Sequence, residues 1–489
     1  MLFSSPTFLF IFLPLVLFLF FLVGKRAQIL FLILASIIFY FWGQTDFVLI
    51  ILILIYLNYS LGKRIQRFKT DNRLLAKKVL IFSIILNLGF LIYYKYRFFL
   101  LSNLILVNKY IPTPQIITDF LSNPSPFLPL AISFFIFHAI SYQIDIYQKK
   151  SIAEKDIKKL ALYFLMFPHL LAGPILRYHQ IKDQLEKRII LKEDFIKAIN
   201  RFIIGLGKKV LIADRLAATA NEIFAIPAQR LDISTAWLGI ICFTLQIYFD
   251  FSAYSDMAIG LAKMFGFNFP ENFNYPYISS SIREFWRRWH ITLSNWFRDY
   301  LYIPLGGSRR NSMRVYLNLM IVFLLCGLWH GTRWNFVIWG GIHGLFLILE
   351  RVKNGSLINF LPKPLKHLYV LSVVITSWVF FRTESIDEAI TYLKTLSGFG
   401  ENVIKYRPIN YFISNDLIIT LLVAVILSFP VYAYVNNLLH DLTKRLLKYN
   451  YALIPIIQTT KIVYFMILLF LSFLMMAIQT YRPFVYFKF

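Results

Sequence analysis

Long unbroken runs of apolar residues recur along the whole chain, separated by shorter polar stretches. The first run, Phe8 to Val23, shows neither the alternation of a surface strand nor the spacing of an amphipathic helix. A transmembrane barrel would show short alternating segments instead, and helices are then the remaining way to satisfy the backbone within lipid. The pattern therefore predicts an all-α polytopic membrane protein.

About twelve of these runs are apolar enough to cross a bilayer. They are Ser5–Val23, Ala27–Trp42, Phe47–Leu61, Val79–Tyr94, Pro126–Tyr147, Val210–Pro227, Thr235–Phe251, Val315–Trp329, Trp334–Leu349, Leu368–Phe381, Leu417–Val435 and Ile462–Ile478. Several are shorter than the roughly 17 to 25 residues of an ordinary span, so we expect about 11 to 12 transmembrane helices together with re-entrant and amphipathic segments. No internal repeat or low-complexity linker divides the sequence, and residues 1–489 are expected to form one membrane domain.

Basic residues set the orientation, because cytoplasmic loops carry an excess of Lys and Arg. The stretch Lys63–Lys78 is strongly basic and is predicted to be cytoplasmic, whereas the polar loop Ile111–Ser125 and both termini are predicted to lie outside. The segment Leu160–Leu176 breaks the alternation, since both of its flanks are basic and Pro168 and Pro174 interrupt a helix. We interpret it as a re-entrant segment, whose backbone survives at membrane depth only where protein or a cavity surrounds it.

Composition supports the membrane assignment, because 58% of the residues are hydrophobic and only 16% are charged. A net charge of +26 would suggest nucleic acid as a partner of a soluble protein, but these cations cluster in loops beside apolar runs. We therefore expect the lipid bilayer, and no nucleic acid, as a partner. The two cysteines, Cys242 and Cys326, lie in apolar runs and provide neither a disulfide framework nor a cysteine-based zinc site, so no metal is expected.

Arginine, tryptophan and a single histidine crowd the stretch Ser281–Arg310. If this stretch is one helix, four polar residues share one cationic face: Arg283, Arg287, His290 and Ser294. The candidate donor- or substrate-binding residues are Arg283, Arg287, Arg288, Trp289, Ser294, Asn295 and, further along, Trp329. The alternative is a juxtamembrane amphipathic helix whose arginines contact lipid phosphates.

Two histidines, His330 and His343, are embedded in the apolar stretch Val322–Leu345. A histidine at membrane depth is costly unless it faces a cavity or has a partner, which makes each a functional candidate. The glycine after His330 leaves room for a substrate, and apolar surroundings favour the neutral imidazole that a general base requires. The alternative is a histidine hydrogen-bonded between helices, which we favour for His343 and, elsewhere, for His138 and His169.

Two carboxylates, Asp250 and Asp256, lie in the apolar run that follows Tyr248. Their spacing does not place them on one helical face, which argues against a pair of acid–base carboxylates. Acids in such runs more commonly hold intramembrane Arg or hydroxyl partners, so both are structural candidates. The sequence lacks the motifs of zinc proteases, ATPases and serine hydrolases.

Three segments follow one another in a distinctive order: YFDFSAYSDMAIG, FPENFNYPYISSSIREFWRRWHITLSNWFRDYLYIPLGG and LWHGTRWNFVIWGGIHG. This order resembles the membrane-bound O-acyltransferase (MBOAT) superfamily. The opening MLFSSPTFLFIFLPLV and the FYFWG that follows it make the chain most similar to the alginate O-acetylation subgroup. The resemblance covers nearly the whole chain, with a motif core at about 240–350 and additional C-terminal spans at about 368–489.

The resemblance implies a helical enzyme of the bacterial inner membrane, with spans around a thin central region. It gives His330 as the catalytic residue and His290 as its helper. The implied donor is acetyl-CoA or another acyl thioester from the cytoplasm, with no bound cofactor, and donor phosphates would bind Arg283, Arg287 and Arg288. The acceptor hydroxyl would come from outside, on an exported or cell-wall polysaccharide or on a periplasmic acetyltransferase or acceptor protein.

Three alternatives stay open. They are D-alanyl-type transfer to a cell-envelope polymer, a transporter or flippase subunit of a polysaccharide export complex, and a non-catalytic scaffold. The related D-alanyl transferases share the motifs but are typically shorter, so the additional C-terminal spans favour acetylation. Acyl transfer by the purified protein would separate an enzyme from a transporter or a scaffold.

Overall fold

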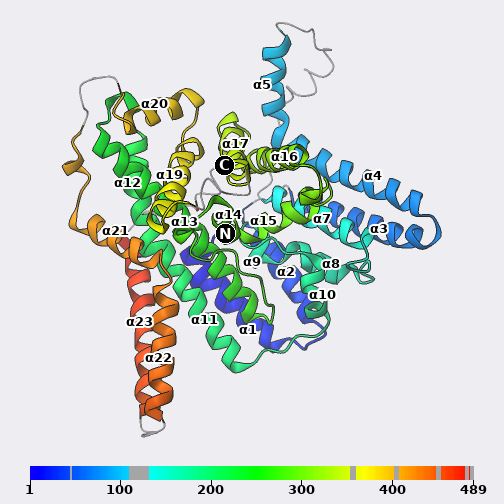
Figure 1. Cartoon of the computed structure of the whole chain (residues 1–489). Coiled ribbons are helices and arrows are strands. Elements are labelled where there is room, and N and C mark those ends of the chain that lie inside the picture. The colour runs from blue at the N-terminus through cyan, green and yellow to red at the C-terminus, as the bar shows by residue number, and fades with distance from the viewer. Residues whose placement is uncertain are drawn as a thin grey trace. The chain divides into compact units, whose positions relative to one another are not determined.

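The computed structural model describes residues 1–43, 47–108, 131–352, 360–400, 407–447, 453–478 and 484. All regular secondary structure in this part of the chain is helical (Figure 1), which confirms the all-α prediction. The loop Ile111–Ser125 and the last residue, Phe489, which were predicted to lie outside the membrane, fall outside the described residues.

Six of the described helices are long and apolar enough to cross a membrane. They are Val48–Asp71, Arg73–Ile105, Ile233–Met264, Ser312–His330, Lys363–Arg382 and Pro455–Ile478. Four shorter apolar helices cover Phe8–Leu22, Gln28–Phe41, Trp334–Leu349 and Asn415–Leu427. The predicted span Val210–Pro227 differs from these, because a π-helical turn ends at Ala213 and the α-helix that continues it, α12 (Asp214–Phe224), carries Asp214, Arg215 and Glu222.

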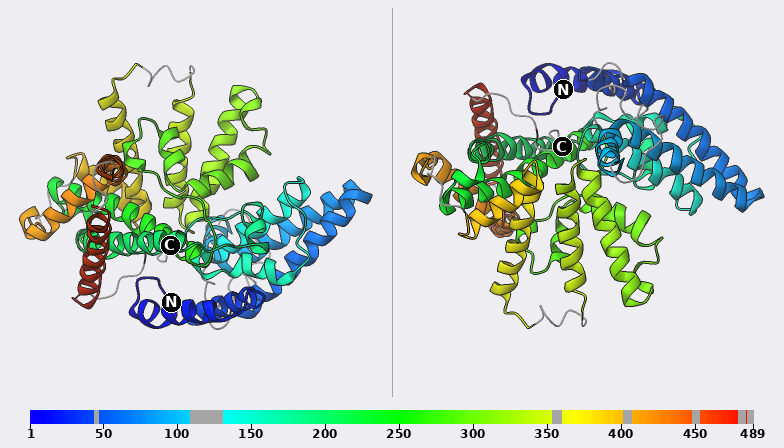
Figure 2. Two further views of the ribbon diagram at one scale, coloured as in Figure 1. Left: turned by 90° about the horizontal axis from the view of Figure 1, so that it is seen from below. Right: turned by 90° about the horizontal axis from the view of Figure 1, so that it is seen from above.

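One compact unit consists of Met1–Leu191 and Ala262–Pro270. Its helices are η1 (Phe8–Phe12), α1 (Leu13–Leu22), α2 (Gln28–Phe41), α3 (Val48–Asp71), α4 (Arg73–Leu91), η2 (Ile92–Tyr96), α5 (Arg97–Asn108), α7 (Ile132–Tyr147), α8 (Ile157–Leu165), α9 (Phe167–Leu170) and α10 (Tyr178–Glu186). Helices α3 and α4 form a hairpin (Figures 1 and 2). Asn58 and Asn87 exchange amide hydrogen bonds of 3.1 and 3.0 Å across it, so each polar side chain satisfies the other among apolar neighbours.

The segment Leu160–Leu176 does not form a continuous helix. An interrupted helix is what the re-entrant interpretation predicts for this backbone. Helix α8 ends at Leu165, the short α9 ends at Leu170, and the chain is then non-helical up to Arg177. Residues 162–176 are all buried, and the backbone N–H of Leu176 donates to Nε2 of His138 at 3.1 Å. Burial in protein is the setting in which a membrane protein tolerates irregular backbone.

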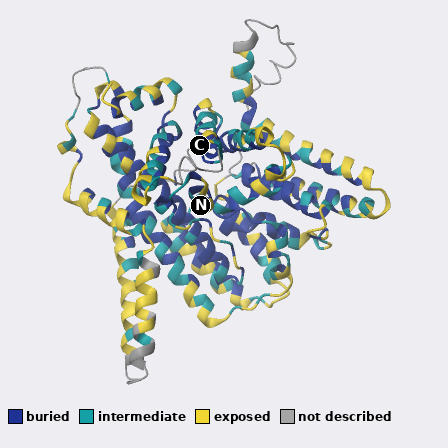
Figure 3. Cartoon of the chain, viewed as in Figure 1, coloured by how far each residue is buried: buried dark blue, intermediate teal, exposed yellow. Residues whose placement is uncertain are grey.

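The second compact unit consists of Lys192–Leu261 and Glu271–Phe489. Its helices are α11 (Lys192–Gly207), η3 (Lys208–Ala213), α12 (Asp214–Phe224), η4 (Ala228–Arg230), α13 (Ile233–Met264, of which the last three residues belong to the first unit), η5 (Pro276–Ile278), α14 (Ile282–Arg288), α15 (Ile291–Phe297), η6 (Arg298–Tyr302), η7 (Gly307–Arg309), α16 (Ser312–His330), α17 (Trp334–Leu349), α19 (Lys363–Arg382), α20 (Ile386–Leu396), η9 (Ile409–Tyr411), α21 (Asn415–Leu427), α22 (Val431–Leu447) and α23 (Leu453–Ile478). Most of α13 is buried, whereas α23 is largely exposed (Figure 3).

Helices α16 and α17 touch through their backbones. A Cβ atom added to Gly327 would lie 2.1 Å from the carbonyl oxygen of Phe336, and one added to Gly340 would lie 2.1 Å from that of Phe323. Any larger residue at either position would therefore separate the helices. This contact fixes the end of α16, where His330 lies.

Candidate active site

The arginine-rich stretch is two short helices instead of one. Helix α14 ends at Arg288, Trp289 is extended, and His290 adopts a left-handed conformation (φ 41°, ψ 54°) before α15 begins at Ile291. A left-handed non-glycine residue is costly and is retained only where its surroundings impose it. The prediction of one cationic face was therefore wrong, because the turn buries His290 completely while Arg283 and Arg287 stay exposed.

A neighbouring loop imposes this turn. The backbone N–H of Asn274 donates to the carbonyl of Arg288 at 2.9 Å, and the N–H of Ile291 donates to the carbonyl of Asn272 at 2.9 Å. The loop thus binds the chain on both sides of His290. Asn272 is itself fully buried, and its side-chain Oδ1 lies 3.2 Å from Nδ1 of His290. Sequence reasoning did not single out Asn272, although it lies within the FPENFNYPY segment that carried the resemblance.

Aromatic rings surround His330, the last residue of α16. Its ring centroid lies 4.9 Å from that of Trp329, 5.0 Å from that of Trp339 and 5.5 Å from that of Phe381. The side chain is buried, with 5% of its surface exposed. Helices α16, α17 and α19 thus each contribute an aromatic ring to the surroundings of His330.

The structure brings His290 and His330 together. Their ring centroids are 6.4 Å apart, and Trp329 lies beside both rings, at 6.2 Å from His290. Phe251 of α13 packs on His290 at 4.7 Å. Burial lowers the pKa of His290 to about 3, so this imidazole is neutral at physiological pH.

His343 has the geometry of the interhelical alternative. Its Nε2 lies 3.0 Å from Oγ of Ser377, which joins α17 to α19. Ser377 donates its own proton to the carbonyl of Val374 at 2.8 Å, so Nε2 of His343 carries the hydrogen in this pair. The ring also stacks on Phe285.

The candidate donor-binding residues do not share one environment. Arg288 is held by its own neighbours, since its Nε donates to Glu284 at 2.9 Å and its Nη1 to the carbonyl of Asn274 at 3.1 Å. Burial alone would raise the pKa of Glu284. Hydrogen bonds from Ser280 and Arg288 outweigh this effect and hold that pKa below its ordinary value. The two remaining arginines, Arg283 and Arg287, are exposed and available to a ligand.

Of the other candidates, Trp289 is a core residue. It is fully buried and packs between Phe285, at a centroid distance of 5.6 Å, and Trp378, at 5.1 Å. Ser294 and Asn295, on the first turns of α15, are half-buried. A substrate could reach these two side chains but not the indole of Trp289.

Asp250 and Asp256 bind cations. Asp250 accepts from Nζ of Lys209 at 2.6 Å, and the same ammonium lies 2.9 Å from Asp214. Asp256 contacts Lys208 at 2.7 Å and Arg201 at 2.9 Å. The carboxylates therefore join α13 to η3 and α11 through ion pairs.

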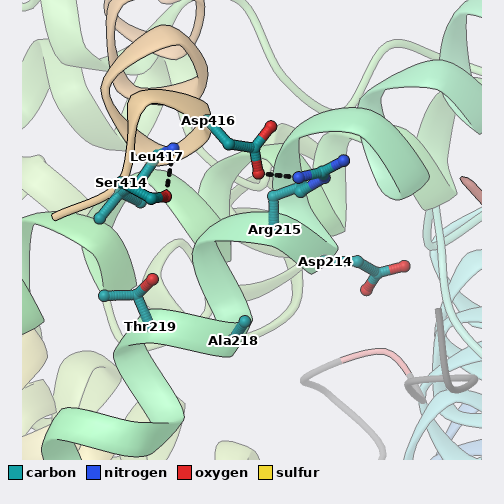
Figure 4. Close-up of a pocket in the computed structure, with 7 residues that line it drawn as sticks. All are labelled: Asp214, Arg215, Ala218, Thr219, Ser414, Asp416 and Leu417. Atoms are coloured by element: carbon teal, nitrogen blue, oxygen red, sulfur yellow. Dashed lines mark hydrogen bonds and ion pairs between the residues drawn. The ribbon is translucent and has the colours of Figure 1, made fainter. Parts of the chain in front are cut away.

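A pocket lies between α12 and the start of α21 (Figure 4). Its lining is Asp214, Arg215, Ala218, Thr219, Ser414, Asp416 and Leu417. Arg215 and Asp416 form an ion pair within it, and Oγ of Ser414 accepts from the N–H of Leu417 at 3.1 Å. None of the candidate residues from the sequence lines this pocket.

Among the described residues, no three His, Cys, Asp or Glu side chains are grouped so as to hold a metal ion.

Comparison with known proteins gives consistent matches. The family model described as "MBOAT, membrane-bound O-acyltransferase family" matches residues 148–386. The chain is 43% identical over 401 residues to the probable alginate O-acetylase of Pseudomonas aeruginosa, which covers 82% of this chain and 75% of that protein. It is 34% identical to the peptidoglycan O-acetyltransferase of Helicobacter pylori over 81% of this chain and 80% of that protein. It is 30% identical to the teichoic acid D-alanyltransferase of Bacillus subtilis, over 47% of this chain and 62% of that protein.

Proposed function

Because the chain belongs to the membrane-bound O-acyltransferase family, and is therefore an O-acyltransferase of a membrane, we propose that it moves an acetyl group from a cytoplasmic thioester across the bilayer. The donor in this proposal is acetyl-CoA. The product is an O-acetylated polysaccharide that is exported or part of the cell wall, of the alginate type.

One observation carries the proposal: two buried histidines from separate helices, His290 and His330, lie with ring centroids 6.4 Å apart. A neutral imidazole that is enclosed by apolar groups can accept the proton of a hydroxyl. This arrangement supports proton transfer better than it supports a transport pathway lined by charges.

The proposed reaction needs only the donor, the acceptor and one base. His330 takes the proton of the acceptor hydroxyl as its oxygen attacks the thioester carbonyl, and a carbon–oxygen bond forms. The tetrahedral intermediate then collapses, the carbon–sulfur bond breaks, and the leaving thiolate takes the proton back from His330. A positioned general base contributes about 10²- to 10⁴-fold to such a rate.

The donor would bind at the exposed face of α14. Arg283 and Arg287 present guanidinium groups there, and guanidinium is well suited to the phosphates of a CoA-type carrier. The acetyl group would reach the histidines from the cytoplasmic side and the acceptor from the other side, so the carrier itself need not cross. In the orientation that the basic loops predict, both termini would lie on the periplasmic side of a bacterial inner membrane.

The relatives favour acetylation of an alginate-like acceptor over the alternatives. Two probable alginate O-acetylases are 43% and 42% identical to the chain over 82% of its length. The D-alanyltransferase match covers only 47% of the chain. A periplasmic acetyltransferase or acceptor protein could receive the acetyl group first, and the exported glycan would then be the final product.

Acyl transfer by the purified protein tests the proposal. The protein would be reconstituted in lipid nanodiscs, supplied with radiolabelled acetyl-CoA and an uronic acid oligosaccharide, and the labelled product measured. A parallel reaction would supply a D-alanyl thioester carrier. Transfer of acetyl is expected. Transfer of D-alanine alone, or binding of glycan with neither transfer, would overturn the proposal in favour of D-alanylation or of transport.

A further inference from the structure

Asn272 makes an unusual number of contacts with the turn at His290. Its carbonyl accepts from the N–H of Ile291 at 2.9 Å. Its side-chain Oδ1 accepts from the N–H of Thr292 at 3.3 Å and from the hydroxyl of Thr292 at 2.9 Å, and lies 3.2 Å from Nδ1 of His290. Its Nδ2 donates to Oγ of Ser255 on α13 at 3.1 Å. One buried amide thus links α13 to α15 and to the histidine.

These contacts fix which way the amide of Asn272 faces. A backbone N–H can only donate, so the atom that faces Thr292 is the oxygen. The same oxygen faces Nδ1 of His290, which must therefore carry a hydrogen. In a neutral imidazole the other nitrogen then has the lone pair, and Nε2 of His290 is buried with no hydrogen-bond partner among the described residues.

From this geometry we infer that Asn272 is a positioning residue, which holds His290 in the tautomer whose Nε2 can only accept a hydrogen bond. The inference rests on the proposed function, since it concerns what His290 does in acyl transfer. Neutral His290 then cannot donate from Nε2 to an oxyanion. It accepts a hydrogen bond from a group that enters between it and His330.

The surroundings of His290 make this role testable by pH. Its ring lies beside Phe251 of α13, Phe273 of the loop, Trp329 and His330 of α16, and the amide of Asn272. Of these groups only His330 has an ionisable side chain. A new carboxylate beside Nδ1 would therefore be the dominant charge acting on the ring.

The test replaces Asn272 with aspartate. Asn272→Asp keeps an acceptor at Oδ1 for Thr292 and His290 but adds a negative charge, which favours the protonated imidazole. Because the pKa of His290 rises, activity should be lost on the acid side at a higher pH than in the wild type, by about 1 to 3 pH units. Asn274→Asp adds the same charge two residues along, on an exposed side chain, and is the matched control whose pH profile should coincide with that of the wild type.

A second variant keeps the inference falsifiable if the aspartate protein is inactive. Asn272→Ala leaves His290 neutral but free to change tautomer, and should lower kcat about 10- to 100-fold with an unchanged donor KM. An aspartate variant that loses more activity than the alanine variant as the pH is lowered supports the inference, since only aspartate favours the protonated ring. Equal loss of activity in both variants, or loss of both proteins from the membrane, would assign Asn272 a purely structural role and overturn it.

The two proposals fail separately in this experiment. Wild-type protein that transfers no acetyl group overturns the proposed function. An active wild type whose pH profile is reproduced by Asn272→Asp overturns only the positioning role.

Discussion

Two polar clusters are buried in the same compact unit, and they are stabilised in opposite ways. Around Asp250, the charges are compensated, because Lys209 lies between two carboxylates at 2.6 and 2.9 Å. Around His330, the neighbouring rings of Trp329, Trp339 and Phe381 supply no fixed charge. A compensated charge resists any change of protonation, whereas a neutral imidazole can gain and release a proton. The contrast supports a structural role for the first cluster and the proposed catalytic role for the second.

The largest expected effect is the loss of acetyl transfer when His330 is replaced, in a protein that still folds. Glutamine can keep a hydrogen bond but cannot take a proton, so His330→Gln should lower acetyl transfer by about 10²- to 10⁴-fold. The measurement is product formation at matched protein amounts, with melting temperature as the folding control. His290→Ala should be less severe. Near-normal transfer by His330→Gln would show that His330 is not the base, and His290 would take its place.

Substitutions among the ion pairs around Asp250 should lower the stability of the protein more than they lower its activity. Lys209→Met leaves the carboxylates of Asp250 and Asp214 without their shared cation, and breaking one side of a buried pair costs about 3 to 5 kcal/mol. The yield of folded protein and its melting temperature in detergent should both fall. The double variant Lys209→Met with Asp250→Asn should recover part of the loss. An unchanged melting temperature, together with lost transfer, would instead place this cluster in the reaction.

A smaller effect is expected at the exposed face of α14. Arg287→Gln should raise the donor KM several-fold while changing kcat less, and the difference should shrink at high salt because exposed charges are screened. Arg64→Gln, an exposed arginine of α3, is the matched control. A fall in kcat with unchanged donor KM would rule out phosphate binding and favour a contact of Arg287 with lipid.

The smallest effect should be seen at His343. His343→Phe would keep the aromatic packing on Phe285 but lose the hydrogen bond to Ser377, at a cost of about 1 kcal/mol in the free energy of unfolding. Transfer should stay near the wild-type rate, measured in the same assay as for His330→Gln. A loss of activity as deep as that of His330→Gln would mean that a third histidine takes part in the reaction.

The sequence was sufficient for the fold class, because the fold class depends on composition along the chain. Apolar runs predicted helices, and histidines within them stood out as costly. The family resemblance identified His330 and His290 together, and comparison with known proteins confirms the family. That their rings meet could not be read from spacing, since the contact depends on how separate helices pack.

Local backbone geometry was the part that the sequence did not reveal. Helical periodicity placed His290 beside Arg287, but the left-handed turn at His290 reverses its direction and buries it. The turn is imposed by hydrogen bonds from a loop that precedes α14, in which Asn272 is the central residue. A pattern within one helix carries no information about a contact with another segment, so an ordinary-looking asparagine in FPENFNYPY gave no signal.

The backbone contact between α16 and α17 has a consequence for how such an enzyme can diversify. Because Gly327 and Gly340 let peptide groups touch directly, the spacing of the two helices at these points is set by backbone atoms. Exchange of an aromatic residue around His330 would therefore leave this backbone contact in place. New acceptors could be accommodated by altering the side chains around His330, while the two glycines preserve the contact between the helices.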